Sequence, residues 1–295
     1  MLLSTQTSHI FKLFGEEKGI SILKGAGYDG LDLTLTRLSR EGADSYIFSG
    51  DSAISYAEQV KKWADDAGIV FSQGHTPFDF NWSNPNEFED RFVPLTIKGL
   101  EICATVGADI VVVHPFNYGE NGKNREEIFD INMKFYRRLI PVAKDLGIKI
   151  ALENLFRDDP KRTSHLPSTC GTEEDFIRYM DTLDSEYIVG CLDLGHASIA
   201  GIEPQDFIRA LGHDRLKALH VHDNSYNSDG HTLPGLGKMD WEEITRALAE
   251  INYDGNFNYE ADNFMKGFED DFKPVACRFM ADRGRHLIKK IESYK

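Results

Sequence analysis

The stretch Ile148-Lys149-Ile150-Ala151-Leu152-Glu153 is a largely apolar run that ends on a carboxylate, and the same pattern recurs along the chain. Most such runs are short and lack a clean polar alternation, which is typical of strands buried on both faces. If the strands close into a ring, these side chains point at one centre, as at the C-terminal face of an α/β barrel. The other runs end at or near His75 (from Ile69), His114 (from Ile110), Asp193 (from Tyr187), His222 (from Leu216) and Glu260 (from Asn256).

Strand-like and helix-like segments alternate from one end of the chain to the other. A length of 295 residues lies within the range of one α/β barrel. We therefore expect residues 1–295 to form a single (β/α)8 TIM-barrel domain of the α/β class. An open doubly wound sheet is the alternative, but ligands at so many strand ends suit a closed ring better. The predicted helices cover residues 16–25, 52–67, 87–106, 126–146, 172–183, 205–211, 241–250 and 272–293.

Composition argues against several classes of protein: nucleic-acid binding, disulfide-rich, secreted and membrane-spanning. The formal net charge of -15 argues against broad binding to nucleic acid, which depends on neutralising phosphates, although a local basic groove can exist on an acidic chain. The four cysteines form no CxxC motif, so neither a disulfide framework nor a cysteine zinc site is expected. The N-terminus reaches polar residues too soon for a signal peptide, and no apolar stretch approaches a membrane span. We expect a cytoplasmic protein without a membrane partner.

Glu153, Asp193, His222 and Glu260 are the strongest candidate metal ligands. Two glutamates, one aspartate and one histidine make a hard, oxygen-rich set that suits Mn²⁺ or Mg²⁺ and tolerates Co²⁺ or Zn²⁺. A single carboxylate at a strand end is more often a surface residue or a helix N-cap, so the prediction depends on all four occurring in strand order. We expect a divalent metal cofactor, with Mn²⁺ as the first choice.

Several further histidines and one aspartate are candidate site residues, and for each of them a purely structural role is the alternative. Histidines at strand ends can simply bond a loop carbonyl. His196 follows Asp193 by three residues, so both face one pocket if the segment turns helical. His220 and His222 have the same orientation in a strand, so one can be a ligand and the other its supporting partner. The additional candidate ligands are His75, His114, His196, Asp229 and His231, the last two in a polar loop where solvent exposure is the alternative.

Several motifs together resemble those of the xylose-isomerase-like barrel superfamily, which includes ketose 3-epimerases, inositol-catabolism enzymes, hydroxypyruvate isomerases and endonuclease IV. The resemblance covers nearly the whole chain in the right order. The set is specific for the superfamily and does not choose a substrate. The motifs are Ala151-Leu152-Glu153-Asn154, Cys191-Leu192-Asp193-Leu194-Gly195-His196, Leu219-His220-Val221-His222-Asp223-Asn224, Pro234-Gly235-Leu236-Gly237 before Asp240-Trp241, and Tyr259-Glu260.

The resemblance implies a mononuclear metal site at the four strongest ligands, with Glu153 and Glu260 also acting as acid and base. It implies that His196 contacts the sugar, and His231 stands where the family usually has an arginine, a departure from the ketohexose epimerases. We expect His114, His231 and Trp241 to contact substrate as well. Aromatic residues that could wall the pocket are Trp241, Phe78, Phe116, Tyr118 and Phe156.

The expected function is therefore metal-dependent isomerisation or epimerisation of a sugar or sugar derivative. A proton would pass between carbons through a metal-held enediolate, with the two glutamates as acid and base. The expected partners are a small sugar substrate and further copies of the chain in a homo-oligomer.

Similarity to endonuclease IV implies a second function, hydrolysis of phosphate esters such as abasic DNA at a trinuclear zinc site. Against this function, the loops show no cluster of Arg and Lys with aromatic residues of the kind that binds DNA. A third alternative is a barrel that binds sugar or metal without turnover, although a pure binder needs no acid-base pair. The nine ligands implied by the trinuclear site are His75, His114, Glu153, Asp193, His196, His222, Asp229, His231 and Glu260.

Overall fold

Eight parallel strands form one sheet in the order β10-β1-β2-β3-β4-β5-β8-β9. The computed structural model describes residues 1–39, 52–78, 88–117 and 124–295. The two edge strands meet, because Val221 N donates to Asn258 O at 2.8 Å and Glu260 N donates to Val221 O at 3.1 Å. The predicted (β/α)8 barrel is thus confirmed. Its strands are β1 (Leu3–Gln6), β2 (Gly30–Thr34), β3 (Val70–His75), β4 (Ile110–Val112), β5 (Lys149–Glu153), β8 (Ile188–Asp193), β9 (Leu216–His220) and β10 (Phe257–Tyr259).

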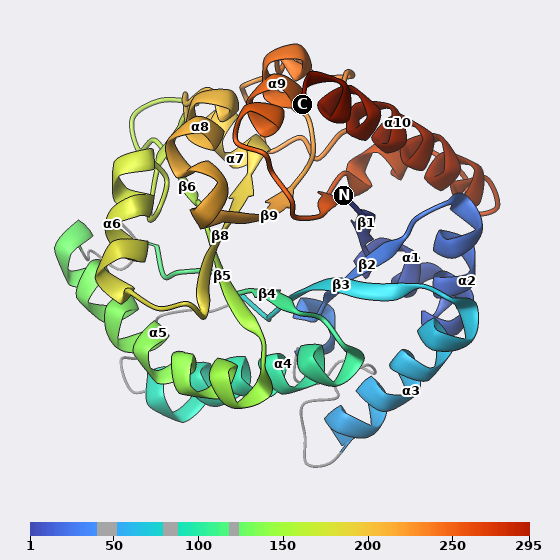
Figure 1. Cartoon of the computed structure of the whole chain (residues 1–295), viewed down its shortest axis with the longest axis horizontal. Helices are drawn as coiled ribbons and strands as arrows, with labels where there is room; N and C mark the ends of the chain where they lie inside the picture. The colour runs from blue at the N-terminus through green and yellow to red at the C-terminus, as the bar shows by residue number, and fades with distance from the viewer. Residues whose placement is uncertain (40–51, 79–87, 118–123) are drawn as a thin grey trace.

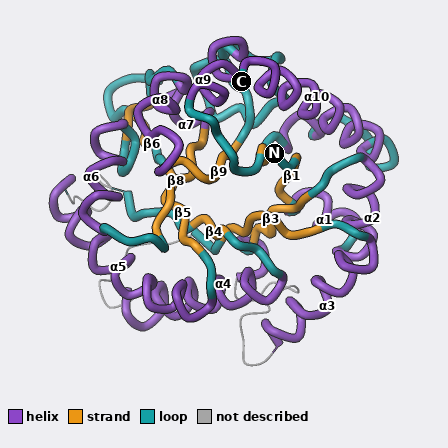
Figure 2. The backbone as a smooth tube through the Cα atoms, in the orientation of Figure 1, coloured by secondary structure: helices purple, strands orange, loops and turns teal. Residues whose placement is uncertain are grey.

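Helices surround the ring of strands on its outer side (Figure 1), and Figure 2 shows the strands as an inner layer within them. Glycine ends several helices as predicted: Gly107 and Gly147 have φ angles of 92° and 70°, which an L side chain rarely adopts. The helices are α1 (Ser8–Phe14), α2 (Glu16–Ala26), α3 (Ser52–Ala67), α4 (Val93–Val106), α5 (Arg125–Leu146), α6 (Glu173–Leu183), α7 (Leu194–Ile199), α8 (Pro204–Arg215), α9 (Trp241–Glu250) and α10 (Lys273–Tyr294).

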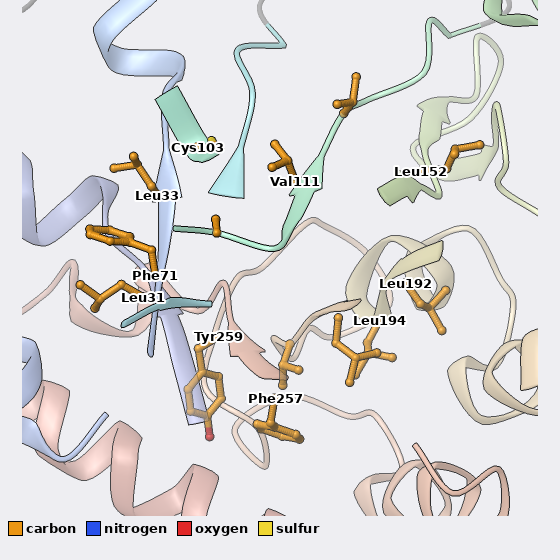
Figure 3. Packing of buried hydrophobic residues seen from close by; sticks show 14 of the residues in the cluster. Leu31, Leu33, Phe71, Cys103, Val111, Leu152, Leu192, Leu194, Phe257 and Tyr259 are labelled. Carbon is orange, nitrogen blue, oxygen red and sulfur yellow. The ribbon is translucent and has the colours of Figure 1, made fainter. Parts of the chain in front are cut away.

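The apolar core has two parts, which follow from the alternation of side chains along each strand. The larger cluster packs between the strands and the helices, and Figure 3 shows members of it such as Leu152 and Leu192. The smaller cluster consists of Val112, Ala151, Val189, Cys191 and Ala218, which alternate with those residues and therefore face the inside of the ring. Glu153, Asp193 and His220 each lie two residues beyond a member of the smaller cluster, so they also point inward.

Several elements differ from the sequence prediction. A short hairpin of β6 (Phe156–Asp158) and β7 (His165–Pro167) follows β5, and neither α1 nor α7 was predicted. The predicted helix over residues 87–106 consists of a π-helical turn, η2 (Phe88–Phe92), followed by α4. Among the described residues, no helix combines the length and apolar character needed to cross a membrane.

Candidate active site

Within the described part of the chain, three groups of potential metal ligands lie at the C-terminal mouth of the barrel. The first is His75, His114 and Glu153; the second is Glu153, Asp193, His220 and Glu260; the third is His222, Asp229 and His231. Within each group the candidate ligand atoms lie within 4.8 Å of one another. Glu153 belongs to two groups, so a single buried carboxylate joins them. Eight of the nine residues belong to the predicted nine-ligand set, and the ninth is His220 instead of His196.

The predicted ligand His222 contacts one carboxylate of the second group, Asp193, with its Nε2 atom at 3.0 Å. His220, which was not among the predicted ligands, lies near all three carboxylates. Its Nδ1 atom lies 3.2 Å from both Glu153 Oε1 and Glu260 Oε2, and 3.9 Å from Asp193 Oδ2. Strand register explains the difference, because His220 pairs with Asp193 across β8 and β9 whereas His222 lies past the end of β9. His220 Nδ1 is buried and has no hydrogen-bond partner among the described residues.

Asp32 supports His220 from behind. Its Oδ2 atom lies 3.8 Å from His220 Nε2 and accepts hydrogen bonds from Gln73 Nε2 at 2.9 Å and Asn258 Nδ2 at 2.8 Å. At 3.8 Å the contact between Asp32 and His220 is electrostatic and is not a hydrogen bond. Asp32 lies on β2 and has no partner nearby in sequence, so only the closed ring reveals this role.

Three further histidines are held by backbone carbonyls. The Nδ1 atoms of His75, His196 and His231 donate to Thr76 O (2.8 Å), Asn154 O (2.9 Å) and Glu260 O (2.7 Å). A carbonyl can only accept, so each ring carries its proton on Nδ1 when neutral and offers the Nε2 lone pair to the site. The carbonyl bond considered as an alternative to a site role for His75 is therefore present, and it favours metal binding at the other nitrogen.

The third group adjoins the second through His222. His222 Nε2 donates to Asp193 Oδ1 at 3.0 Å, and its ring stacks on that of His231 with centroids 4.1 Å apart. Gly195 makes room for this ring, since a Cβ atom at residue 195 would lie 1.8 Å from His222 Cε1. His196 lies at the edge of both groups, with Nε2 3.7 Å from Asp229 Oδ2 and 3.9 Å from Asp193 Oδ2.

The buried carboxylates are balanced by histidines. Burial alone would raise the pKa of Glu153, but His220 and His114 lower it well below its usual value. Against the same effect of burial, His196 and His222 hold the pKa of Asp193 at about 2. Burial would lower the pKa of His231, yet Asp229 and Glu260 raise it to about 10. Buried carboxylates whose negative charge is balanced by protonated histidines form an environment that suits a divalent cation.

A buried aspartate, Asp223, organises the loop that carries Asp229 and His231. It accepts the backbone N–H groups of Gly235 and Gly237 at 2.7 and 3.1 Å and the indole N–H of Trp241 at 2.8 Å. Trp241, expected to contact substrate, is only 6% exposed and instead packs behind this loop.

Aromatic rings lie beside the histidines at the mouth. Phe78 stacks on His114 with centroids 4.4 Å apart, and Phe156 lies 5.0 Å from His196. Phe116 is buried against Phe135 rather than facing the mouth, and Tyr118 lies outside the described residues.

Comparison with known proteins identifies relatives of the whole barrel. Residues 20–274 match the family model described as xylose isomerase-like TIM barrel. An uncharacterized protein of Methanocaldococcus jannaschii is 31% identical over 75% of this chain and 83% of its own length. The D-psicose 3-epimerase of Enterocloster bolteae is 31% identical over 67% of this chain and 63% of its own length. The crystal structure of a D-tagatose 3-epimerase-like protein shares the fold, with a TM-score of 0.75, 22% identity and coverage of 99% and 97% of the two chains.

Proposed function

Because the chain belongs to the xylose isomerase-like TIM barrel family, we propose that it is a divalent-metal-dependent isomerase or epimerase of a sugar or sugar derivative. The observation that carries this proposal is the convergence of Glu153 and Glu260 on one histidine nitrogen, each at 3.2 Å. The family relationship to a D-psicose 3-epimerase and the epimerase-like fold support it further.

The donor set fits a hard divalent ion. Glu153, Asp193, His220 and Glu260 provide three carboxylates and one imidazole, and the unpartnered His220 Nδ1 faces all three carboxylates. These four residues would hold the ion, with Mn²⁺ the first choice and Mg²⁺, Co²⁺ or Zn²⁺ as alternatives. When bound, the ion would supply Lewis-acid polarisation of a substrate carbonyl.

The two glutamates differ in access, which suggests how they divide the proton transfer. The Glu153 side chain is 1% exposed and held among histidines, whereas Glu260 is 18% exposed at the mouth. Glu260 can therefore reach a proton on the carbon next to the carbonyl of a substrate lying over the site. Glu153, which lies 3.2 Å from the same His220 nitrogen, would return a proton to another carbon or face. Phe78 and Phe156 would help to exclude water from the substrate.

The test is Glu260→Gln in a panel of ketoses incubated in D₂O. We expect the variant to keep its fold and to lose solvent deuterium incorporation by at least about 100-fold, the usual contribution of a positioned acid or base. Glu58→Gln, an exposed glutamate on α3, is the matched control and should behave as wild type. Undiminished exchange in Glu260→Gln would overturn the acid-base assignment.

Hydrolysis of a phosphate ester at a three-ion site is the second candidate function. It is favoured by one observation, the presence of three ligand groups of which two share Glu153 and the third meets Asp193 through His222. Clustered ions could stabilise both the attacking and the leaving oxygen of a displacement. Elemental analysis of protein purified without chelator separates the two functions: about one hard ion per chain supports the isomerase, and about three zinc ions support the hydrolase.

A further inference from the structure

A second feature of the barrel mouth lies beside the ligand groups, between the ends of β1 and β10. It is a pocket of about 420 Å³, within the size range of small-molecule sites. His231 lines the pocket and bonds the carbonyl of Glu260, so the pocket adjoins the candidate active site. Its lining residues are Gln6, Ser8, His9, Lys12, Arg37, His231, Asp262, Asn263 and Lys266.

Positive charge gathers in this pocket although the chain as a whole carries -15. Lys12 and Lys266 are exposed, and neither ammonium group has a hydrogen bond or ion pair with another described residue. Arg37 is the third cation of the lining and pairs with Glu16 at 3.1 Å. Among the described residues of the lining, Asp262 is the one carboxylate, and it accepts a hydrogen bond from the Ser8 hydroxyl at 3.3 Å.

The pKa of His9, which lines the pocket, responds to the charges around it. Burial lowers its pKa, Lys273 lowers it further, and Lys12 and Lys266 both act in the same direction against Asp270. The two lysines line the same pocket from different elements, Lys12 from α1 and Lys266 from the segment after β10. Lysine is a common partner of phosphate groups, and two unpaired lysines that converge on a small pocket favour an anion there.

We propose that this pocket binds an anionic group, a phosphate or a carboxylate, at the end of the substrate remote from the reacting carbon. The inference rests on the proposed function only for the sugar nature of that substrate. A molecule whose reacting carbon lies at Glu260 would extend past His231 and place its anionic end between Lys12 and Lys266. The substrate is then an acidic sugar, such as a sugar phosphate or a sugar acid.

The test is a double charge reversal, Lys12→Glu with Lys266→Glu, in the whole chain as purified without chelator. Titration calorimetry would compare fructose, fructose 6-phosphate, a hexuronate and inorganic phosphate as probes. We expect at least one sugar anion to bind wild type about 10-fold or more tightly than fructose, with an advantage that shrinks at high salt and disappears in the double variant. Lys134→Glu, on α5 away from the pocket, is the charge-matched control and should keep the advantage.

The probes distinguish the two kinds of anionic group. The sugar anion with the lysine-dependent advantage identifies the group as phosphate or carboxylate. Equal affinity for fructose and both anions in wild type, or an advantage that survives in the folded double variant, would overturn the inference. Lysine-dependent binding of inorganic phosphate alone, with neither sugar anion binding more tightly than fructose, would also overturn it. Glu260→Gln should keep the anion preference, so a failure of the proposed isomerase chemistry is measured independently of this binding.

Discussion

Gly195→Ala is the substitution that most directly tests the geometry of the site. Gly195 lies in the first turn of α7, two residues after Asp193, and the ring of His222 packs against it. An added Cβ atom would lie 1.8 Å from His222 Cε1, 2.4 Å from Nε2 and 2.6 Å from Nδ1. Because ordinary contact begins near 3.4 Å, the ring must retreat by about 1.6 Å, the difference between the two distances.

That retreat breaks two contacts. His222 Nε2 moves out of hydrogen-bond range of Asp193, now 3.0 Å away, and the ring leaves its stack on His231. Overpacking costs about 1–3 kcal/mol and the lost buried hydrogen bond adds about 1.5–3 kcal/mol, with partial overlap between them. We expect a loss of about 3 kcal/mol in unfolding free energy, which lowers Tm by about 6 °C in a chain of this size.

The assay combines thermal unfolding with elemental analysis. The variant should lose metal bound by His222, Asp229 and His231 while ions held by the second group remain. A one-ion enzyme would thus keep its metal, and a three-ion enzyme would lose about one ion. Gly25→Ala is the matched control, since nothing lies within 4 Å of its added Cβ on α2, and it should gain about 0.5–1 kcal/mol. Unchanged Tm and metal content in Gly195→Ala, with the His222 ring unmoved, would refute this reasoning.

Three other substitutions test the surrounding structure. Asp193→Asn should lower both metal content and Tm, with a stability loss of about 3 kcal/mol, because it removes the charge paired with buried histidines; a variant that retains its metal through dialysis would exclude Asp193 as a ligand. Asp29→Asn should cost about 1 kcal/mol at pH 7. Burial raises the pKa of Asp29, but Arg285 lowers it, to below 3.8. The ion pair with Arg285 therefore stabilises the folded protein at neutral pH, and this contribution is lost as the pH falls through the pKa of folded Asp29. Urea unfolding from pH 7 to about pH 3 should show the stabilities of the two proteins converging, and a constant difference would contradict the prediction. Asp223→Asn should cost about 2–4 kcal/mol and expose the loop after β9 to limited proteolysis, because the amide replaces one acceptor oxygen by a donor facing backbone N–H groups; an equally resistant loop would show that Asp223 is not its anchor.

Much of the fold can be predicted from the sequence because each strand and helix is specified by residues close together in the chain. Buried parallel strands appear as short apolar runs, and amphipathic helices and glycine caps mark the segments between them. The hairpin of β6 and β7 was missed because its strands have three residues each and pack over the mouth rather than in the ring. Extent as a single domain, location in the cytoplasm and assembly into a homo-oligomer stay predictions.

The choice between His220 and His222 shows where local information ends. Both histidines follow the same apolar run with the same orientation, and both contact a carboxylate: His222 Nε2 bonds Asp193 at 3.0 Å, and His220 Nδ1 lies 3.2 Å from Glu153 and from Glu260. The pairing of Asp193 with His220 across β8 and β9 decides which histidine contacts the two glutamates. Asp32 and the pocket lysines, Lys12 and Lys266, had no signal of their own, since each meets its neighbours from a distant part of the chain. Trp241 was expected at the substrate because a loop aromatic does not reveal in sequence which way it packs.

The (β/α)8 architecture and the set of strand-end side chains that face one centre can be read from the amino-acid order, because strand period and strand order are properties of the chain. The division of those side chains into three ligand groups, the histidine that contacts Glu153 and Glu260, and the positive charge beside them follow from the folded arrangement. Distances between strand ends depend on register and on closure of the ring, which arise from hydrogen bonds between segments far apart in the chain.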